Sequence, residues 1–274
     1  MVRILEGKTV REEIIQRLKK EIEGFSSVPT LAIIQVGDNE ESGVYIKQKK
    51  IFAEKIGAHV RHLKFDADIS QEQIILEIEN LNADKDIQGI IVQLPIPKNL
   101  DEQVIIETIN PKKDVDGLTS TTSFMPATTR GILNLLNYYQ INPSDKNVVV
   151  MGRSKLVGKP TAEALLNLGA KVIVAHSQTE NIKEVTKQAD ILVVAIGKPK
   201  LVDVSYVREG QVIIDVGINV SKDSEGKKVL CGDVNFDEVK DIVTAISPVP
   251  GGVGLMTVCA LFENLILTNS LKGV

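Results

Sequence analysis

The amino-acid sequence predicts an α/β fold in which two α/β domains lie around a cleft. Apolar segments of strand length alternate with segments of helical periodicity along almost all of the 274 residues. This alternation is typical of βαβ units with parallel strands. Residues 191–196 and 212–216 are apolar without polar alternation, as expected for strands buried on both faces. The length allows one large or two medium-sized domains, and a boundary near residues 117–130 fits the order of elements best.

The first half of the chain holds helices with recognisable start and stop signals. Thr9 and Glu12 form the pattern of a capping box, and apolar residues follow it at helical spacing. The predicted elements are, in order, a helix opened by Thr9, a strand at 31–36, a helix from Ser42 to Gly57, a helix capped by Ser70 and Gln73, a strand at 89–94 and a helix at 102–109.

The second half of the chain repeats the alternation of helices and strands. A final apolar helix follows a glycine-rich turn, which allows the chain to change direction before it. The predicted elements are a helix at 131–139, a strand at 147–151, a helix at 160–168, strands at 171–175, 191–196 and 212–216, and the last helix at 255–267.

Composition and charge exclude several classes of protein. Lys and Arg number 32 against 36 Asp and Glu, a net charge of −4, so we expect no nucleic-acid partner and no anionic membrane surface. No apolar run approaches the ~18–20 residues of a membrane span, and the charged N-terminus lacks a signal-type apolar core. Two cysteines cannot build a disulfide framework, and the sequence has no CxxC or HExxH metal pattern. We therefore expect a cytoplasmic protein that holds no metal.

A glycine turn after the strand at 147–151 is the first candidate binding site. Gly152 follows this strand, and Gly158 and Pro160 open the next helix. Glycine lets the backbone approach a phosphate, and a helix N-terminus supplies free N–H groups and a positive dipole. The glycine spacing differs from the usual G-x-G-x-x-G pattern, so a dinucleotide site and a plain βα turn are equally good interpretations of this segment alone.

The strand at 171–175 favours NADP over NAD as the ligand of this turn. In an NAD site an acidic residue follows that strand and binds the ribose 2′-hydroxyl, whereas here His176 and Ser177 follow it. Arg153, Ser154 and Ser177 could instead surround a 2′-phosphate, which a carboxylate would repel. The alternative is that Ser177 only caps the next turn and that His176 is structural.

The helix from Ser42 to Gly57 carries a lysine on its apolar face. Tyr45, Lys49 and Phe52 fall on one stripe at 3.6 residues per turn, while the neighbouring lysines fall on the opposite face. A lysine in such a position often extends its amine into water. Alternatively, partial burial lowers the pKa of the Lys49 amine towards neutrality, and the amine acts as a general base.

Polar residues at the ends of other elements extend the candidate site. Gln93 follows the strand that begins at residue 89, and open α/β sheets bind ligands at the carboxyl ends of their strands. Asp116 lies where the first domain leads into the second, a common position for a cleft. Residues 248–254 form a loop rich in glycine and proline. Each of these segments is also compatible with an ordinary turn or hinge.

Taken in order, these segments closely resemble one family, the bifunctional methylenetetrahydrofolate dehydrogenase/cyclohydrolases. The resemblance spans nearly the whole chain. The segments that carry it are Tyr45–Lys49, Val92–Pro95, Lys113–Gly117, Gly152–Pro160, His176–Ser177, Asp215–Asn219, Gly232–Val234, Pro248–Gly254 and Met256–Val258.

The resemblance implies two reactions in one cleft. 5,10-Methylenetetrahydrofolate is oxidised to the methenyl form with NADP, and the product is hydrolysed to 10-formyltetrahydrofolate. Residues 1–120 with 255–274 would form the folate-binding catalytic domain, and residues 121–254 the Rossmann-like NADP-binding domain. The resemblance also implies a homodimer formed through the cofactor domain.

The resemblance assigns roles to individual residues. Lys49 would transfer the proton of the hydrolytic step, with support from Gln93 and Tyr45, and Asp116 would bind the pterin. The remaining assignments place Val92, Leu94, Pro250, Gly251, Gly252, Val253 and Gly254 at the folate, and Gly152, Arg153, Ser154, Ser177 and Ile218 at the cofactor.

Three other functions compete with this interpretation. A monofunctional dehydrogenase would not need Lys49 and Gln93, and a non-catalytic NADP-binding sensor would not need a proton-transfer lysine. A shikimate-type dehydrogenase fits the fold class but lacks the segments at 92–95 and 250–254. One departure from the family is a loop of only nine residues, 117–125, between Asp116 and Pro126, where relatives usually carry more.

Overall fold

The computed structural model describes residues 2–222 and 226–270, which form two compact units. The first unit contains the residues up to Arg11 together with Thr128–Thr257, and the second contains Glu12–Ala127 together with the residues from Val258. The sequence places the corresponding boundaries at residues 120 and 254. The prediction that one domain binds the folate and the other binds NADP stays a prediction.

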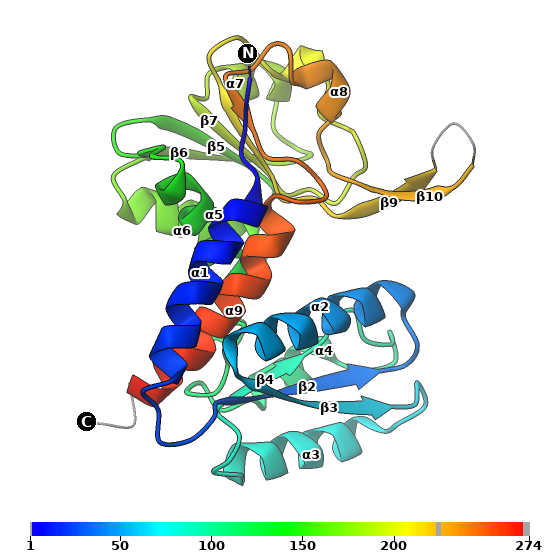
Figure 1. Cartoon of the computed structure of the whole chain (residues 1–274). Helices are drawn as coiled ribbons and strands as arrows, with labels where there is room; N and C mark the ends of the chain where they lie inside the picture. The colour runs from blue at the N-terminus through cyan, green and yellow to red at the C-terminus, as the bar shows by residue number, and fades with distance from the viewer. Residues whose placement is uncertain (1, 223–225, 271–274) are drawn as a thin grey trace. The chain divides into compact units, whose positions relative to one another are not determined.

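The first unit is built on a six-stranded sheet in which every neighbouring pair of strands is parallel (Figure 1). The strand order β1-β11-β8-β7-β5-β6 reverses at β5, so that consecutive strands lie on either side of it. Ligands of such sheets bind at the carboxyl ends of the strands at this reversal. The strands are β1 (Arg3–Ile4), β5 (Asn147–Met151), β6 (Lys171–Ala175), β7 (Ile191–Val194), β8 (Val212–Asp215) and β11 (Ala245–Ile246).

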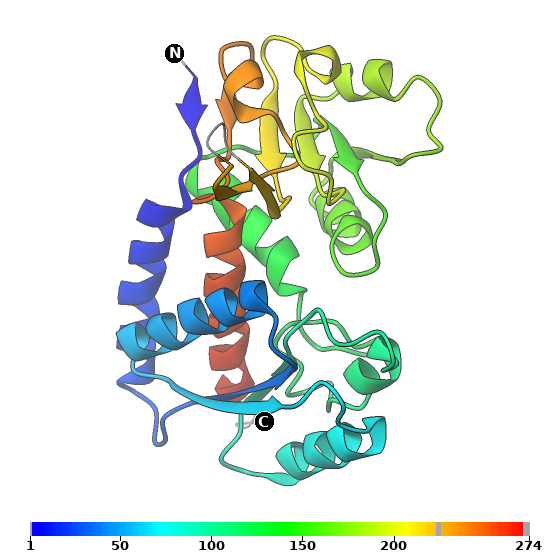
Figure 2. The same ribbon diagram turned by 90° about the vertical axis from the view of Figure 1, so that its right-hand side faces the viewer.

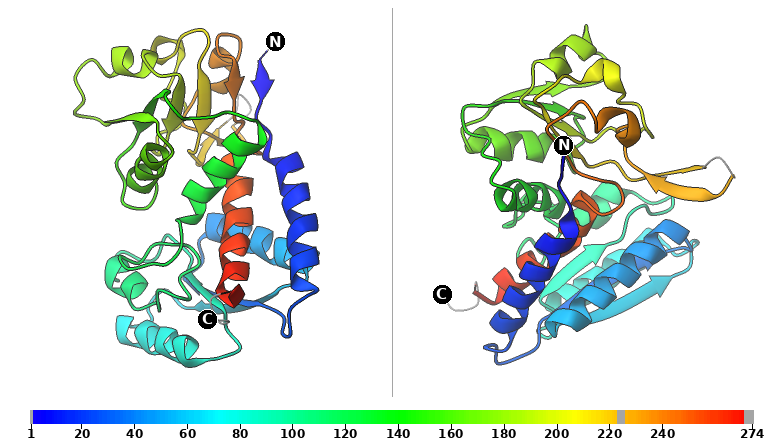
Figure 3. Two further views of the ribbon diagram at one scale, coloured as in Figure 1. Left: turned by 90° about the vertical axis from the view of Figure 1, so that its left-hand side faces the viewer. Right: turned by 45° about the horizontal axis from the view of Figure 1, so that its top comes forward.

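Helices and one hairpin complete the first unit. The antiparallel hairpin of β9 (Asn219–Lys222) and β10 (Lys228–Cys231) extends away from the sheet (Figure 3). A buried cluster that includes Val149, Leu192 and Ile213 forms the core. The helices are α5 (Ala127–Tyr138), α6 (Gly158–Asn167), α7 (Ile182–Lys187) and α8 (Phe236–Val239), with a short 3₁₀ helix at Val204–Tyr206.

The second unit is built on a three-stranded parallel sheet of order β3-β2-β4. Helix α2 covers one face of this sheet and α3 the other (Figures 1 and 2). Phe52 of α2 stacks on Phe262 of the last helix with ring centroids 5.1 Å apart, and both rings are fully buried. The elements are β2 (Thr30–Val36), β3 (His59–Phe65), β4 (Gly89–Val92), α2 (Glu40–Ile56), α3 (Gln71–Ala83) and α4 (Glu102–Glu107), to which α1 (Gly7–Ile22) and α9 (Val253–Ser270) contribute.

Most of the elements expected from the sequence are confirmed. Strands β5 and β6 have the predicted bounds, and Ser70 and Gln73 form the predicted capping box of α3. Gly57 ends α2 in the left-handed conformation, with φ of 82°. Strands β1, β3 and β11, the β9–β10 hairpin and the short helices α7 and α8 were not anticipated. Strands β1 and β11 have only two residues each, and β3 is a half-exposed edge strand.

The predicted capping box at Thr9 is wrong. Helix α1 begins at Gly7, so Thr9 lies within its first turn. The reason is a long-range contact: the Gly7 N–H donates to the Gly251 carbonyl oxygen at 2.7 Å, and a Cβ at Gly7 would lie 2.6 Å from the Gly252 oxygen. A distant loop therefore determines where this helix starts. No helix in the described ranges is both long enough and apolar enough to cross a membrane.

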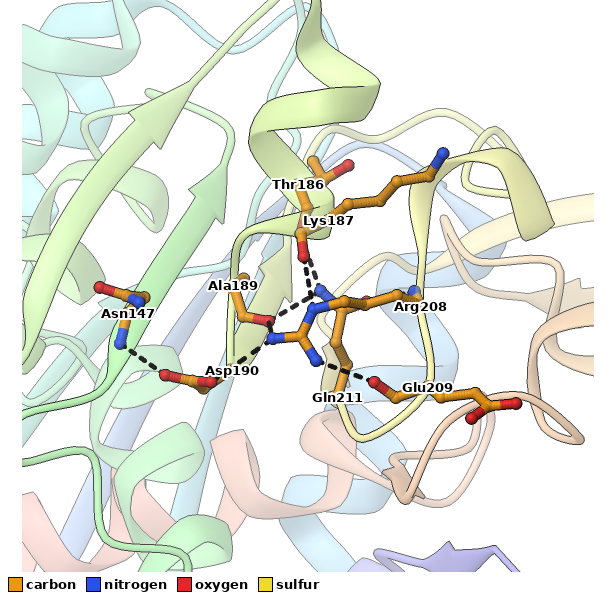
Figure 4. A network of polar contacts seen from close by, with 8 residues as sticks. All are labelled: Asn147, Thr186, Lys187, Ala189, Asp190, Arg208, Glu209 and Gln211. Atoms are coloured by element: carbon orange, nitrogen blue, oxygen red, sulfur yellow. Dashed lines mark hydrogen bonds and ion pairs between the residues drawn. The ribbon is translucent and has the colours of Figure 1, made fainter.

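A polar network at the amino ends of the strands holds the first unit together (Figure 4). The Arg208 guanidinium donates to the carbonyl oxygens of Lys187, the last residue of α7, at 2.6 Å and of Ala189, just beyond the helix, at 3.0 Å. The fully buried Gln211 amide donates to the oxygens of Thr186 at 2.8 Å and Ala189 at 2.9 Å. These bonds satisfy carbonyl groups that the end of a helix leaves without intrahelical partners.

Replacing Gln211 by Leu should destabilise the protein. The substitution keeps the side-chain size but removes the Gln211 oxygen that accepts the Arg208 N–H at 2.8 Å, together with the two Gln211 donors. Leaving that N–H without its acceptor costs about 1–3 kcal/mol. The measurement is the free energy of unfolding from urea titration. Gln16→Leu on the exposed face of α1 is the control, and equal losses in the two variants would contradict the role of the network.

Candidate functional site

A lysine–glutamine pair forms the centre of the candidate site in the second unit. Lys49 projects from α2 and is 9% exposed, and its Nζ donates to Gln93 Oε1 at 2.7 Å. Gln93 follows β4, where its backbone N–H donates to the Ile34 oxygen at 2.8 Å. Its side-chain amide donates to the Leu94 oxygen at 2.8 Å. The Gln93 amide is thus oriented so that its oxygen faces the lysine.

The electrostatics of this pair depend on burial. Desolvation lowers the pKa of the Lys49 amine, and the negative charge of Asp116 opposes that shift. Desolvation also raises the pKa of Asp116, which the charge on Lys49 opposes. Since burial is the larger cause for both groups, each carries its charge less readily than in water. The interpretation of Lys49 as a lysine that reaches water does not fit this burial.

Asp116 is held in a loop that a second carboxylate organises. Asp114 is 1% exposed and accepts hydrogen bonds from the Gly117 N–H at 3.0 Å and from the N–H and hydroxyl of Thr119 at 2.8 and 2.9 Å. Gly117 has φ of 75°, and a Cβ there would lie 2.7 Å from Pro126. This packing fixes both ends of the short loop that follows Asp116.

Asn264 is a second organiser of this loop that the sequence interpretation missed. It is fully buried in α9, and its amide donates to the carbonyl oxygens of Val115 and Met125, both at 2.9 Å. An asparagine within a helix that is otherwise strongly apolar was the available signal. Asp114 gave a weaker signal, because Asp-x-Asp-Gly is also an ordinary turn sequence.

The other residues predicted at the folate differ in their surroundings. Tyr45 is half-buried and lies one turn before Lys49 on α2. Val92 is buried in the core of the second unit, whereas Leu94 is half-buried and precedes a cis peptide bond to Pro95. The Ser42 hydroxyl donates to the Leu94 oxygen at 3.3 Å, which ties the start of α2 to this segment. The contact of these side chains with a folate stays a prediction.

The glycine turn of the first unit is closely packed at the point where the sheet order reverses. Gly152 has φ of 126°, and a Cβ there would lie 2.1 Å from the Ala195 carbonyl oxygen at the end of β7. A Cβ at Gly158 would lie 2.3 Å from the Gly152 oxygen. The Ser154 hydroxyl accepts the N–H groups of Val157 and Gly158, each at 3.2 Å. Only glycine fits these two positions, and the turn leads into the N-terminus of α6.

The residues predicted to recognise a 2′-phosphate lie on the surface beside this turn. Arg153 is exposed, and its guanidinium donates to Gln178 Oε1 at 3.2 Å. The turn after β6 is closed by His176 and Thr179, since the His176 N–H donates to Thr179 Oγ1 at 2.9 Å. Ser177 is left exposed between them. The hydroxyl that accepts a backbone N–H in this turn is therefore that of Thr179, and the Gln178 N–H donates to His176 Nδ1 at 3.2 Å.

The predicted segment 250–254 belongs to the first unit, together with Ile218. Gly251 has φ of 108°, and a Cβ at Gly252 would lie 2.6 Å from the Pro248 oxygen. A Cβ at Gly254 would be 3.4 Å from Ile218 Cδ1. The Ile218 side chain is 41% exposed, so it leaves apolar surface available to a ligand. No group of three or more metal-binding side chains occurs in the described ranges.

Two family models match most of the chain. Residues 5–116 match the catalytic domain of tetrahydrofolate dehydrogenase/cyclohydrolase, and residues 126–272 match its NAD(P)-binding domain. The first match contains the three-stranded sheet and the helix that carries Lys49. The second match contains the glycine turn at Gly152.

Individual relatives agree with these models over full length. The bifunctional protein FolD of Bacillus anthracis is 43% identical over 99% of this chain and 98% of its own. The FolD crystal structure from Campylobacter jejuni has a TM-score of 0.93 at 36% identity and covers 99% of this chain and 100% of its own. A Trypanosoma brucei FolD structure, complexed with NADP cofactor and inhibitor, has the same TM-score at 30% identity and covers 100% of this chain and 99% of its own.

The competing interpretation as a shikimate-type dehydrogenase is limited to a shared fold. A shikimate dehydrogenase structure from Aquifex aeolicus has a TM-score of 0.55 at 15% identity. The matched domains, the full-length identity and the placement of Lys49, Gln93 and Gly152 all lead to one conclusion: the chain belongs to the tetrahydrofolate dehydrogenase/cyclohydrolase family.

Proposed function

We propose that Lys49 is the general base of the cyclohydrolase reaction, with Gln93 orienting its amine. The methenyl substrate is a cation, so a neutral amine is a better neighbour for it than an ammonium group. The hydrogen bond from Lys49 Nζ to Gln93 Oε1, in a buried setting that lowers the lysine pKa, is the observation that carries this proposal.

The hydrolytic step then follows from the placement of these groups. A water oxygen attacks the carbon between the two nitrogens of the methenyl bridge, and Lys49 takes a proton from that water. The added hydroxyl then loses its proton to form the carbonyl as the bond from this carbon to N5 breaks. N5 keeps the electron pair of that bond and takes up a proton, the carbon stays on N10 as the formyl group, and one proton is released overall. Asp116 binds the donor groups of the pterin, and Tyr45 lies one turn along α2 from Lys49, where its ring can contact the flat ligand.

The cofactor proposed for the oxidative step is NADP, held by the first unit. The fit rests on the two glycines that allow close backbone approach at the N-terminus of α6, and on the absence of a carboxylate at residues 176–179 after β6. Arg153 and Ser177 are exposed beside this turn and would bind the 2′-phosphate, while Ile218 offers an apolar contact. When bound, NADP supplies the acceptor for the hydride of the methylene bridge.

We also propose a homodimer that forms through the first unit. Strand β6 is at one edge of the six-stranded sheet, and its backbone can pair with a second copy. Apolar side chains are exposed on β6, on the neighbouring α6 and at the C-cap of α6, namely Ile173, Val174, Leu166 and Leu168. We also propose that the protein acts in the cytoplasm, which the bacterial origin of its full-length relatives supports.

The Lys49→Ala variant should separate the two activities. We expect the cyclohydrolase rate to fall by about 10²–10⁴-fold, the usual contribution of a general base, while part of the dehydrogenase activity remains. The two rates are followed spectrophotometrically, as reduction of NADP and as loss of the methenyl compound. Lys47→Ala, an exposed lysine on the opposite face of the same helix, is the matched control. Equal retention of both activities in Lys49→Ala would exclude this role.

The Arg153→Ala variant should weaken the use of NADP more than that of NAD. Loss of a charged hydrogen bond to phosphate costs ~1.5–3 kcal/mol, so the KM for NADP should rise roughly tenfold to a hundredfold, while the KM for NAD changes little. The control is Lys171→Ala, which removes an exposed positive charge at the amino end of β6. If both cofactors respond equally to Arg153→Ala, the 2′-phosphate is not bound by this residue.

A further inference from the structure

Two buried aspartates of the first unit have no part in the functions proposed above. Asp215 ends β8 and is 3% exposed, and Asp233 follows β10 and is fully buried. Each carboxylate lies against a glycine that is close in sequence to the other aspartate: Asp215 against Gly232, and Asp233 against Gly217. A Cβ at Gly232 would lie 1.8 Å from Asp215 Oδ2, and a Cβ at Gly217 would lie 2.4 Å from Asp233 Oδ1. A side chain at either glycine would therefore displace the carboxylate that faces it.

Asp215 joins the end of β8 to the segment that follows β10. Its carboxylate accepts the backbone N–H groups of Gly217 at 3.0 Å, Asp233 at 3.0 Å and Val234 at 2.9 Å. Burial raises the pKa of Asp215 to about 7, against the lowering effect of these donors. The side chain thus fixes two loops that are 18 residues apart in the chain.

Asp233 in turn fixes the loop that follows β7. Three successive backbone N–H groups donate to its carboxylate, from Ile196 at 2.7 Å, Gly197 at 2.9 Å and Lys198 at 2.8 Å. The Asn219 side-chain amide donates to it as well, at 2.9 Å. Consecutive N–H groups of this kind form a concave site for an anion, and here a carboxylate of the protein already occupies it.

The loops held in this way adjoin two residues of the proposed cofactor site. The loop at 196–198 begins directly after Ala195, whose carbonyl oxygen packs against Gly152. Ile218 lies between Gly217 and Asn219, which contact the two carboxylates. Since the N–H groups of residues 196–198 are already used by Asp233, this loop cannot hold a phosphate. It suits the nicotinamide end of a dinucleotide, which carries no phosphate and is a cation in the oxidised cofactor, and the Gly152–Gly158 turn is left for the phosphates.

We propose that Asp215 and Asp233 are positioning residues for the nicotinamide end of the cofactor, acting through the loops that carry Ala195 and Ile218. The inference rests on the proposed placement of NADP in the first unit. It assigns a function to two sequence segments, 215–219 and 232–234, beyond the contact predicted for Ile218. Neither carboxylate needs to touch the cofactor in this role.

The test compares Asp233→Asn with Asp190→Asn. The first substitution places an amide NH₂ against the backbone donors of the loop that follows β7. Asp190 lies at the opposite, amino end of β7, where its carboxylate accepts the Asn147 N–H at 2.9 Å, and it serves as the control. We expect Asp233→Asn to raise the KM for NADP about tenfold or more, equivalent to roughly 1.4 kcal/mol or more. Cyclohydrolase activity on the methenyl substrate, assayed without NADP, should change less than about twofold. Asp190→Asn should leave both quantities nearly unchanged.

Asn219→Ala provides a milder variant in case Asp233→Asn fails to fold, because it removes one donor to Asp233 and leaves both carboxylates in place. We expect an increase in the KM for NADP of about threefold, of the order of one weak hydrogen bond. A KM for NADP that stays unchanged in a folded Asp233→Asn protein, while Arg153→Ala raises it, would overturn the positioning role and leave the cofactor site intact. If Asp233→Asn, Asn219→Ala and Arg153→Ala all leave the KM for NADP unchanged, the proposed cofactor site itself is wrong.

Discussion

Removal of the Lys49 amine from water is the constraint on which the proposed chemistry depends. An ammonium group on the protein surface keeps its proton at neutral pH, whereas desolvation favours the neutral amine. Helix α2 provides the burial because its apolar face packs on the sheet and on α9 through Phe52. The Gln93 oxygen then gives the amine one polar partner without supplying a second charge.

The buried polar side chains of the two units have different kinds of hydrogen-bond partner. In the second unit, Asp114 and Asn264 use side-chain oxygens and amides to fix one loop, and Asp116 is presented from it. In the first unit, Asp215 and Asp233 accept backbone N–H groups at the carboxyl ends of the strands. Each carboxylate has several donors, as buried charged groups require. The glycines beside them supply the space.

Local sequence signals predicted the elements that depend on local interactions. The bounds of β5 and β6, the Ser70–Gln73 box and the Gly57 end of α2 follow from apolar runs and from short-range capping. Lys49 and Gln93 were recognised because helical periodicity and the end of a strand place them. The features missed depend on contacts between distant segments. Asn264 reaches residues 139 and 149 positions away, and Gly251 determines the start of α1.

Titration of the Lys49 amine shows whether burial makes this amine a base. Nitrogen NMR of the labelled side chain would follow its protonation in the intact protein. We expect a Lys49 pKa below the ordinary lysine value of about 10.4. We expect a further decrease in Asp116→Asn, because removing the negative charge removes its stabilisation of the ammonium form. A Lys49 pKa at or above the ordinary value, unaffected by Asp116→Asn, would contradict the proposal that burial makes this amine a base.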